Sequence, residues 1–413
     1  MSTSLNLQRI RQQFPALNRK HDQNYVIYTD GPAGSQVPLS VAQAMHHYLM
    51  HRNANHGGYF ATSIESDALL LEVRRKLAAF LNVSDPDCIV FGNNMTSLTF
   101  ALSRAIAQTW NEGDEIILSH CDHDANVTPW ALAARDRGVT VRWIDIDPTT
   151  CALNLDTLQK SLSSRTRLVA VGMASNAVGT VHPVTKIAEL AHAAGALVFL
   201  DAVHYAPHLL IDAPATGADF IACSAYKFFG PHVGIVWGHR HLLEEIQPYK
   251  VRPASNTVPD RWMTGTQNHE GIAGVGAAID YLASLASSGS SLRDMLVSAY
   301  NVIASHEHRL GSHFLQGVAM MDGYRVVGHG TMQDRVSTFG ILHERLTAQQ
   351  LSTELAARGI YSWAGNFYAQ PLTERLGLEP DGMLRIGFLH YNTIEEVDRV
   401  LMALQEIGSD ERS

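Results

Sequence analysis

The sequence predicts an α/β protein in which a mostly parallel sheet is covered by helices, with a smaller α+β domain following it. Through the middle of the 413-residue chain, short apolar runs alternate with amphipathic helical patterns, which is typical of a parallel sheet with helices on both faces. After about residue 265, a long helical stretch and then separate strands replace this alternation. We therefore expect an N-terminal arm, a large domain, and a linking helix with a small C-terminal domain, over residues 1–20, 21–265 and 266–413.

The individual elements follow from the length and spacing of the apolar runs. The large domain should contain six buried strands, at 115–119, 139–145, 168–175, 196–201, 219–224 and 234–238. Amphipathic helices are expected between some of them, at 126–137 and 184–194. The small domain should follow a helical stretch at about 271–316, with strands at 335–343, 359–363 and 383–389, a helix near 347–357 and a final helix from residue 393.

Composition and charge exclude several classes of partner. The formal charge of −9 is spread along the chain without a long basic run, which argues against a nucleic-acid or anionic-membrane partner. The N-terminus lacks the apolar core of a signal peptide, and no stretch approaches the roughly 18 apolar residues that span a bilayer. The four cysteines show no CxxC or metal-ligand spacing, so we expect no metal site and a reduced, cytoplasmic protein.

Candidate functional residues follow the predicted strands. Ligands of open parallel sheets bind at the carboxyl ends of the strands, where neighbouring strand ends meet. The segments that follow four of the strands are HCDHDAN, SNAVGT, DAVHY and SAYK, which bring His123, Asn176, Asp201 and Lys227 to one edge. The segment FGNNMTSLTF (91–100) adds a polar turn that opens a helix, and its free N–H groups can hold an anion.

This set of groups suits pyridoxal phosphate. Lys227 would form the Schiff base, and a desolvated pocket that lowers its pKa would keep the amine neutral for that reaction. Asp201 would pair with the pyridine nitrogen and keep it protonated. The remaining contacts would be the helix start at Asn94, Met95 and Thr96 together with Ser224 for the phosphate, His123 for the ring face, and Asn176 for the ring hydroxyl.

Each of these residues also has an ordinary interpretation. An aspartate at a strand end is more often a helix cap, Asn176 alone is typical of a turn, and Lys227 alone could be a solvated loop lysine. His120 and His123 alone resemble surface histidines or a metal-site fragment. Only their joint placement at successive strand ends predicts a cofactor site.

Longer motifs surround these residues: DHDANVTPW, MASNAVGTVHPV, DAVHYAPH, CSAYKFFGPHVGIVWG, TGTQNHEGIAG and RIGFLHYNTIEEVDRVL. In this ordered set the chain resembles the class V aminotransferase family of fold-type I pyridoxal-phosphate enzymes, from about residue 26 to residue 405. Within that family it is most similar to the cysteine desulfurase and selenocysteine lyase branch. The motifs are specific for fold and cofactor, and much less specific for the reaction.

The resemblance implies a role for each matching position. Lys227 would be the cofactor lysine, with Asp201, His123 and Asn176 in the contacts given above. The other cofactor positions depart from the family pattern: His204 stands where a glutamine often lies near the ring hydroxyl, Tyr226 where a histidine often contacts the phosphate, and Asn94 and Met95 where threonines are common.

The same resemblance implies a homodimer and a substrate site. Thr266 matches a residue that reaches the phosphate of the partner subunit, so the two active sites would be shared. Arg385 matches the arginine that grips the substrate carboxylate, for which a planar two-pronged donor is well suited. His56 and Tyr59, within the segment 53–63, would lie at the substrate entrance, although both could be plain surface residues. Arg252 could be a second anion contact or a structural ion-pair residue.

One loop departs from the family pattern in a way that affects the chemistry. Where cysteine desulfurases carry a mobile persulfide-forming cysteine, this chain has WAGNFYA (363–369), with Tyr368 at the cysteine position and Trp363 at an upstream arginine position. No cysteine follows Cys223, and Cys121 is the one remaining thiol that could substitute. Tyr368 could act as an acid toward a leaving group, or form an aromatic wall with Phe367 and Trp363.

The sequence therefore predicts an enzyme that acts on a small L-amino acid or a cysteine derivative. We favour β-elimination with cleavage of a C–S bond, which makes it a lyase; transamination is the alternative, followed by epimerisation or racemisation. A non-catalytic regulatory module with the same fold is the remaining hypothesis. Retention of Lys227, Asp201 and Arg385 argues against it, because a scaffold needs none of them.

Overall fold

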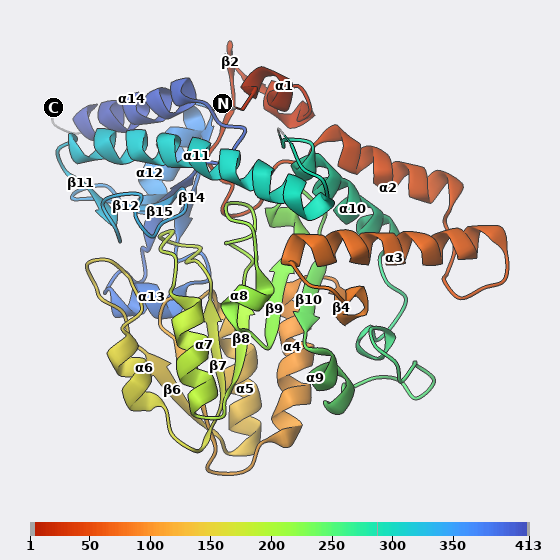
Figure 1. Cartoon of the computed structure of the whole chain (residues 1–413). Helices are drawn as coiled ribbons and strands as arrows, with labels where there is room; N and C mark the ends of the chain where they lie inside the picture. Colours follow the sequence, from red (N-terminus) through yellow and green to blue (C-terminus); the bar gives the residue numbers. More distant parts are fainter. Residues whose placement is uncertain (1–4, 287, 411–413) are drawn as a thin grey trace.

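The computed structural model describes residues 5–286 and 288–410. The large domain contains a seven-stranded sheet, drawn in the lower half of Figure 1. Five of its strands are parallel, and β10 runs antiparallel to both of its neighbours. The strand order is β4 (Ile89–Gly92), β10 (Gly234–Gly238), β9 (Phe220–Ser224), β8 (Leu197–Asp201), β7 (Thr166–Gly172), β5 (Glu115–Ser119) and β6 (Thr140–Ile144). The predicted mostly parallel sheet is confirmed, and each of its six predicted strands is present.

The central strands are buried on both faces because helices cover the sheet. Val198, Phe199 and Leu200 on β8 are all fully buried, although successive side chains point to opposite faces. Apart from α1 and η1 in the N-terminal arm, the helices before the linking segment are α2 (Leu39–His51), α3 (Ala61–Leu81), α4 (Met95–Ile106), α5 (Thr128–Arg137), α6 (Leu155–Ser161), α7 (Val184–Ala193), α8 (Ala213–Thr216) and α9 (Arg240–Glu245), with short 3-10 turns between some of them.

The small domain, at the upper left of Figure 1, has its own antiparallel sheet and apolar core. Phe314, Phe339 and Phe388 pack together in that core. The sheet order is β11 (Tyr324–Val327), β12 (Thr338–His343), β15 (Met383–Gly387) and β14 (Trp363–Gly365). The helices of this part of the chain are α11 (Leu292–Ala319), α12 (Ala348–Ala357), α13 (Gln370–Arg375) and α14 (Ile394–Asp410).

Three features of the predicted elements need correction. The helical stretch expected at 271–316 is two helices, α10 (His269–Ala283) and α11, because the serine- and glycine-containing segment 284–291 between them favours turns over helix. Strands β4 and β11 were not predicted, since each has only four residues. The strand expected at 359–363 is instead divided between β13 (Ile360–Tyr361) and β14.

The N-terminal arm connects the two domains. After α1 (Leu7–Arg11), η1 (Pro15–Asn18) and the small hairpin β1–β2 (Lys20–His21 and Asn24–Tyr25), strand β3 (Ile27–Tyr28) pairs in parallel with β13 of the small domain. The chain then crosses β15, where a Cβ atom at Gly387 would lie 2.3 Å from Cγ of Pro32. Only glycine permits this approach, and it brings residues 30–34 to the carboxyl edge of the large sheet.

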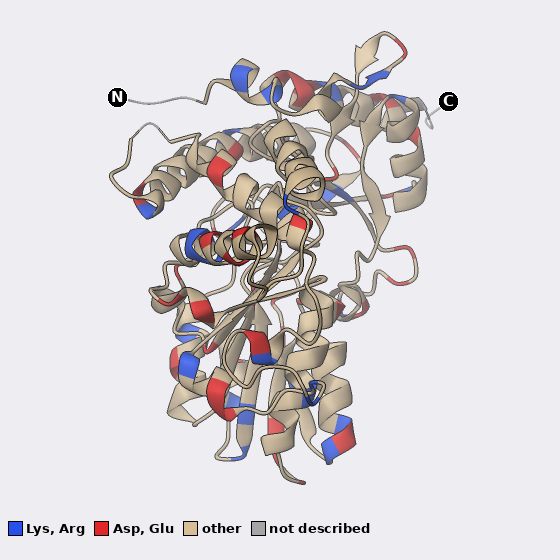
Figure 2. Cartoon of the chain, turned by 90° about the vertical axis from the view of Figure 1, so that its right-hand side faces the viewer, with Lys and Arg blue, Asp and Glu red and all other residues tan. Residues whose placement is uncertain are grey.

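The distribution of charge agrees with the absence of a basic run in the sequence. Figure 2 shows Lys and Arg interspersed with Asp and Glu over the elements in view. Within residues 5–286 and 288–410, no helix combines the length and the apolar character that crossing a membrane requires.

Candidate active site

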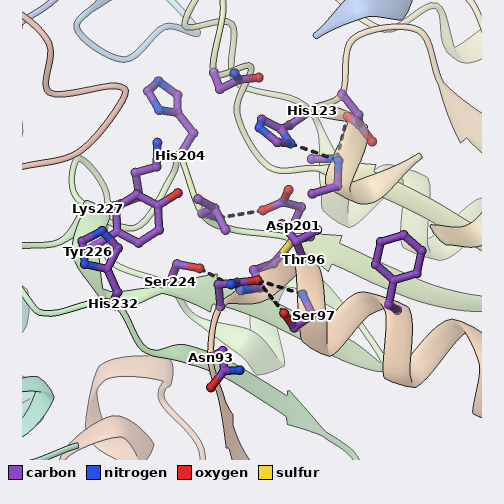
Figure 3. A pocket seen from close by; sticks show the side chains of 18 of the residues that line it. Asn93, Thr96, Ser97, His123, Asp201, His204, Ser224, Tyr226, Lys227 and His232 are labelled. Atoms are coloured by element: carbon purple, nitrogen blue, oxygen red, sulfur yellow. Dashed lines mark hydrogen bonds between the residues drawn. The ribbon is translucent and has the colours of Figure 1, made fainter. Parts of the chain in front are cut away.

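A cavity of about 680 Å³ opens at the carboxyl edge of the large sheet, a size in the range of small-molecule sites. The loops after β5, β7, β8 and β9 and the start of α4 form its walls (Figure 3). All the residues predicted to contact the cofactor within one chain line this cavity: Asn94, Met95, Thr96, His123, Asn176, Asp201, His204, Ser224, Tyr226 and Lys227. The structure thus brings together side chains that are spread over more than a hundred residues of sequence.

Lys227 occupies a dry position that favours its neutral form. It follows β9 in a single 3-10 turn (Ala225–Lys227) and is only 8% exposed. Its Nζ donates hydrogen bonds to the carbonyl oxygens of Pro32 and Ala33, the latter at 2.9 Å. Burial, reinforced by the charge of Arg385, lowers the pKa of Lys227 to about 7. A large fraction of the amine is therefore unprotonated near neutral pH, as a nucleophile or base requires.

Two buried carboxyl groups line the same cavity as this lysine. Asp201 ends β8, and its Oδ1 accepts a hydrogen bond of 2.8 Å from the backbone N–H of Val203. Burial raises the pKa of Asp201 to about 6. Asp122, which the sequence analysis did not single out, also lines the cavity, and burial raises its pKa to about 7. Asp122 is held by the N–H of Gly172 and the amide of Asn126, each at 2.9 Å.

His123 is fixed as a neutral imidazole. The backbone N–H of Ala125 donates to its Nδ1 at 3.0 Å, so Nδ1 carries no proton and the ring proton is on Nε2. Burial, with the charges of Lys227 and Arg385, lowers the pKa of His123 to about 4. One side of the ring stacks on Tyr368, with the ring centres 5.5 Å apart. His123 thus presents an uncharged flat ring in the cavity.

The start of α4 forms the polar end of the cavity (Figure 3). Asn94 caps the helix by accepting from the N–H of Ser97 at 2.8 Å, and the N–H of Met95 donates to Oγ of Ser224 at 2.9 Å. The N–H of Thr96 belongs to the first turn, where helices offer no backbone acceptor. A Cβ atom at Gly234 would lie 2.4 Å from the backbone of Asn94, so this glycine permits the close seating of the turn on β10. This end of the cavity can hold a phosphate.

The opposite end joins the large domain to the small one. Asn176 donates from Nδ2 to the carbonyl oxygen of Phe367 at 2.9 Å, and its own carbonyl accepts from Nη1 of Arg385 at 2.9 Å. Arg385 lies on β15 and is buried, and burial lowers its pKa to about 9. His204 extends the same wall, with Nε2 at 3.0 Å from Oγ1 of Thr338. Arg385 does not itself line the cavity, but its guanidinium group lies close enough to Lys227 to help lower the pKa of that amine.

Other predicted residues lie outside this cavity. Thr266 is exposed in the loop before α10, and His56 and Tyr59 lie on the exposed segment before α3; none of the three lines the cavity of its own chain. Arg252 is also exposed, in the segment between α9 and α10 that contains Thr266, and it does not line the cavity. Trp363 is 54% exposed on β14. None of Trp363, Phe367 and Tyr368 lines the cavity itself, but Phe367 contacts Arg385 and Tyr368 stacks on His123. The aromatic wall therefore stays a prediction, in which Phe367 and Tyr368 are the rings placed beside site residues.

Two further residues near the lysine were not predicted. Asp30 is partly buried, its buried Oδ1 has no hydrogen-bond partner in the described part of the chain, and desolvation raises its pKa to about 6 against the charges of Arg385 and Lys227. The position of Asp30 depends on the chain crossing β15, and no pattern in the sequence around Asp30 predicts that crossing. His232 stacks on Tyr226 with ring centres 5.0 Å apart and lines the cavity. The sequence signal for it is its position five residues after Lys227, within the motif CSAYKFFGPHVGIVWG.

The cysteines do not contribute a reactive thiol to the cavity. Cys88, Cys121, Cys151 and Cys223 are all buried and unpaired, and none lines the cavity. Burial raises the pKa of each thiol, well above the usual value for Cys121. A buried thiol with a raised pKa forms little thiolate, so Cys121 is not a substitute for a mobile cysteine.

These features fit pyridoxal phosphate. The cavity has a phosphate-binding end, a buried carboxyl group for a ring nitrogen, and a lysine amine with a pKa near neutrality. Oδ1 of Asn176 and Nδ1 of His204 are buried without a hydrogen-bond partner among the described residues, as expected for groups that face a polar ligand. The residues present therefore match the charge and polarity of this cofactor along its length.

Comparison with known proteins gives the same result. Residues 27–400 match the family described as Aminotransferase class-V. The chain is 30% identical to a probable cysteine desulfurase of Vibrio cholerae, over 97% of this chain and 98% of that protein. It is 28% identical to a cysteine desulfurase of Synechococcus elongatus over 98% of this chain, but spans only 64% of that longer protein.

A solved structure supports the fold. The apo structure of a cysteine desulfurase from Thermococcus onnurineus covers 99% of this chain and 99% of its own, with a TM-score of 0.89 and 24% sequence identity. The resemblance inferred from the motifs is thus confirmed, together with the fold class and the cofactor. The chain belongs to the class V aminotransferase family, whose members use pyridoxal phosphate.

Proposed function

We propose that this protein is a lyase that eliminates the β-substituent of a small L-amino acid or cysteine derivative, with cleavage of a C–S bond favoured. One observation carries the proposal: the cavity holds a buried lysine with a lowered pKa beside Arg385, while the loop at 366–368 offers aromatic rings and no thiol. Removal of the α-proton needs no cysteine, whereas formation of a persulfide does.

Each residue has a defined part in this reaction. Arg385 would bind the α-carboxylate through its free N–H groups. Lys227 would hold the cofactor and then, as a neutral amine, take the proton from Cα. Asp201 would keep the pyridine nitrogen protonated, and His123 would cover one ring face. When bound, pyridoxal phosphate would supply an electron sink for the pair released at Cα. Lys227 would then return the proton taken from Cα to the sulfur as the Cβ–S bond breaks.

The burial of the thiols supports elimination over sulfur transfer. A desulfurase of the kind named among the relatives would need an accessible thiolate within reach of the substrate sulfur. Tyr368, at the expected cysteine position, is 72% exposed and stacks on His123. The sulfur of a substrate would therefore depart as sulfide or a thiol, not as an enzyme-bound persulfide.

We also propose a cytoplasmic homodimer with shared active sites. Thr266, His56 and Tyr59 are exposed and do not line the cavity of their own chain, which supports a role at the cavity of a second copy. In that arrangement Thr266 would complete the phosphate site, and His56 and Tyr59 would line the substrate entrance.

A product assay tests the proposed reaction against its alternatives. The loaded enzyme is incubated with a panel of amino acids, including cysteine and its S-substituted derivatives, and pyruvate, sulfide and thiols are measured. Elimination yields pyruvate with sulfide or a thiol, without accumulation of the amine form of the cofactor.

Other outcomes would indicate the alternative functions. Accumulation of the amine form would indicate an aminotransferase, and inversion at Cα would indicate an epimerase or racemase. A protein that does not bind the cofactor would be a regulatory module. Fast sulfur transfer from cysteine to a thiol acceptor would contradict the proposed role of the 366–368 loop.

A further inference from the structure

The loop from Asn366 to Ala369, between β14 and α13, has an unusual backbone. Phe367 and Tyr368 are consecutive non-glycine residues with positive φ angles, 57° and 59°. This region of conformational space is unfavourable for residues that carry a Cβ atom, and such strain persists only where the surroundings impose it. The contacts of Phe367 and Tyr368 should therefore explain this conformation.

Three hydrogen bonds hold the strained residues. The N–H of Tyr368 donates to Oδ1 of Asn366 at 3.1 Å. The carbonyl of Phe367 accepts from Asn176 at 2.9 Å, and the carbonyl of Tyr368 accepts from the N–H of Asp124 at 2.6 Å. Two of the three bonds come from the large-domain loops that line the cavity, so the loop is fixed to the active site.

The result is that the Phe367 ring lies over the guanidinium group of Arg385. The guanidinium carbon is 4.2 Å from the ring centre, within the range of a cation–π contact. Arg385 is buried, and it forms no ion pair with a carboxylate within residues 5–286 and 288–410. Its Nη1 is anchored on the carbonyl of Asn176 at 2.9 Å. The Phe367 ring thus adds to the Asn176 carbonyl and the Asp30 carboxyl in compensating a desolvated positive charge.

We propose that Phe367 is a positioning residue for substrate recognition: it holds the Arg385 guanidinium group in place, and so sets the preference for ligands that carry an α-carboxylate. This inference rests on the proposed function, in which Arg385 binds that carboxylate. The strained backbone directs the ring onto the arginine. A ligand that brings an amine but no carboxylate gains nothing from this arrangement.

A neighbouring aromatic residue provides a matched control. Trp363 lies on β14 directly opposite Arg385 in the strand register, but its side chain is largely exposed and outside the cavity. Trp363→Leu removes an aromatic ring from the same sheet without removing the contact with the guanidinium group. Phe367→Leu removes that contact and keeps an apolar side chain at the position.

The test compares two ligands that differ only in the carboxylate. Wild type, Phe367→Leu and Trp363→Leu are loaded with pyridoxal phosphate and titrated with L-alanine or ethylamine, and the change in cofactor absorption gives an apparent Kd. L-Alanine has no β leaving group, so elimination does not interfere. Phe367→Leu should weaken L-alanine binding about 3- to 30-fold, the span of typical cation–π contributions, while ethylamine stays within about two-fold. Trp363→Leu should change neither.

Each result bears on the inference. Equal weakening of both ligands, or an unchanged ratio of their Kd values, would overturn it. If Phe367→Leu does not fold, pentafluorophenylalanine in place of Phe367 keeps the ring shape but reverses its attraction for a cation. The same selective loss of L-alanine affinity is then expected, and an unchanged ratio would overturn the inference. A wild-type protein that binds no cofactor would instead refute the proposed function.

Discussion

The side-chain amide of Asn176, after β7 of the large domain, donates a 2.9 Å hydrogen bond to the carbonyl oxygen of Phe367, after β14 of the small domain. The same asparagine accepts from Arg385 through its backbone carbonyl. One residue of the cavity therefore orients both Arg385, the arginine proposed to bind the substrate, and the loop beside it. The two domains must be docked in this arrangement for the site to be complete.

The buried lysine should make the stability of the cofactor-free protein depend on pH. Burial lowers the pKa of Lys227 from 10.5 to about 7, so between these values the unfolded chain binds more protons than the folded one. The contribution of Lys227 to the free energy of unfolding should thus rise with pH, by up to about 1.4 kcal/mol per pH unit. Lys227→Met should be more stable than wild type at pH 7, measured by urea unfolding midpoints, and the difference should shrink toward pH 10.5.

A surface lysine provides the control for this pH dependence. Lys186 is exposed and pairs with Glu189, so Lys186→Met should show no such trend over the same range. A difference between Lys227→Met and wild type that stays constant from pH 7 to 10.5 would show that the lysine is not desolvated.

The carboxylate of Asp201 should matter for the rate more than for the binding of substrate. Asp201→Asn keeps the size of the side chain but removes the charge opposite the pyridine nitrogen. Loss of one preorganised electrostatic group typically lowers kcat by about 100-fold or more, and we expect that effect here with KM changed far less. Asp156→Asn, on the exposed first turn of α6, is the control and should retain full activity. A kcat near the wild-type value for Asp201→Asn would contradict the assigned role.

Two variants of Tyr368 separate an aromatic wall from a proton donor. If the ring acts only by stacking on His123, Tyr368→Phe should keep kcat/KM for elimination within about three-fold, because the stacking contact is worth about 1 kcal/mol and is retained. Tyr368→Ala should lower it more. Loss of elimination in Tyr368→Phe, with cofactor absorption unchanged, would assign the hydroxyl an acid role instead.

Shared active sites in a homodimer predict complementation between inactive variants. Lys227→Ala removes the cofactor lysine, and Thr266→Asp places a negative charge where the partner's phosphate is expected. Each variant alone should be inactive. After mixing and subunit exchange, a heterodimer contains one site with both native residues, and activity should return. Persistent inactivity of a mixture shown to contain heterodimers would exclude a contribution of Thr266 to the opposite site.

Much of the sheet and cavity could be predicted from the sequence, for a definite physical reason. The carboxyl ends of parallel strands meet at one edge, so His123, Asn176, Asp201 and Lys227 could be assigned to one site from the strand order alone. The strands that precede these four residues could be predicted because each is a continuous apolar run. The four-residue β4 and the break between α10 and α11 lacked such a signal.

The contacts between domains could not be predicted in this way. Asn176 and Arg385 are 209 residues apart, and their contact depends on the docking of two separately formed sheets. The cation–π contact of Phe367 depends in addition on positive φ angles at Phe367 and Tyr368, neither of which is a glycine. Asp30 approaches Lys227 only because β3 pairs with β13 and Gly387 lets the chain cross β15. Such features follow from tertiary packing, not from spacing along the chain.

The covalent attachment of the cofactor tests the account most directly. The loaded protein is treated with borohydride, which makes the lysine–cofactor bond permanent, digested, and analysed by mass spectrometry. We expect the reduced cofactor on the peptide that contains Lys227, and no modification in Lys227→Ala. Attachment to a different lysine, or a protein that stays unmodified after incubation with pyridoxal phosphate, would contradict the central claim.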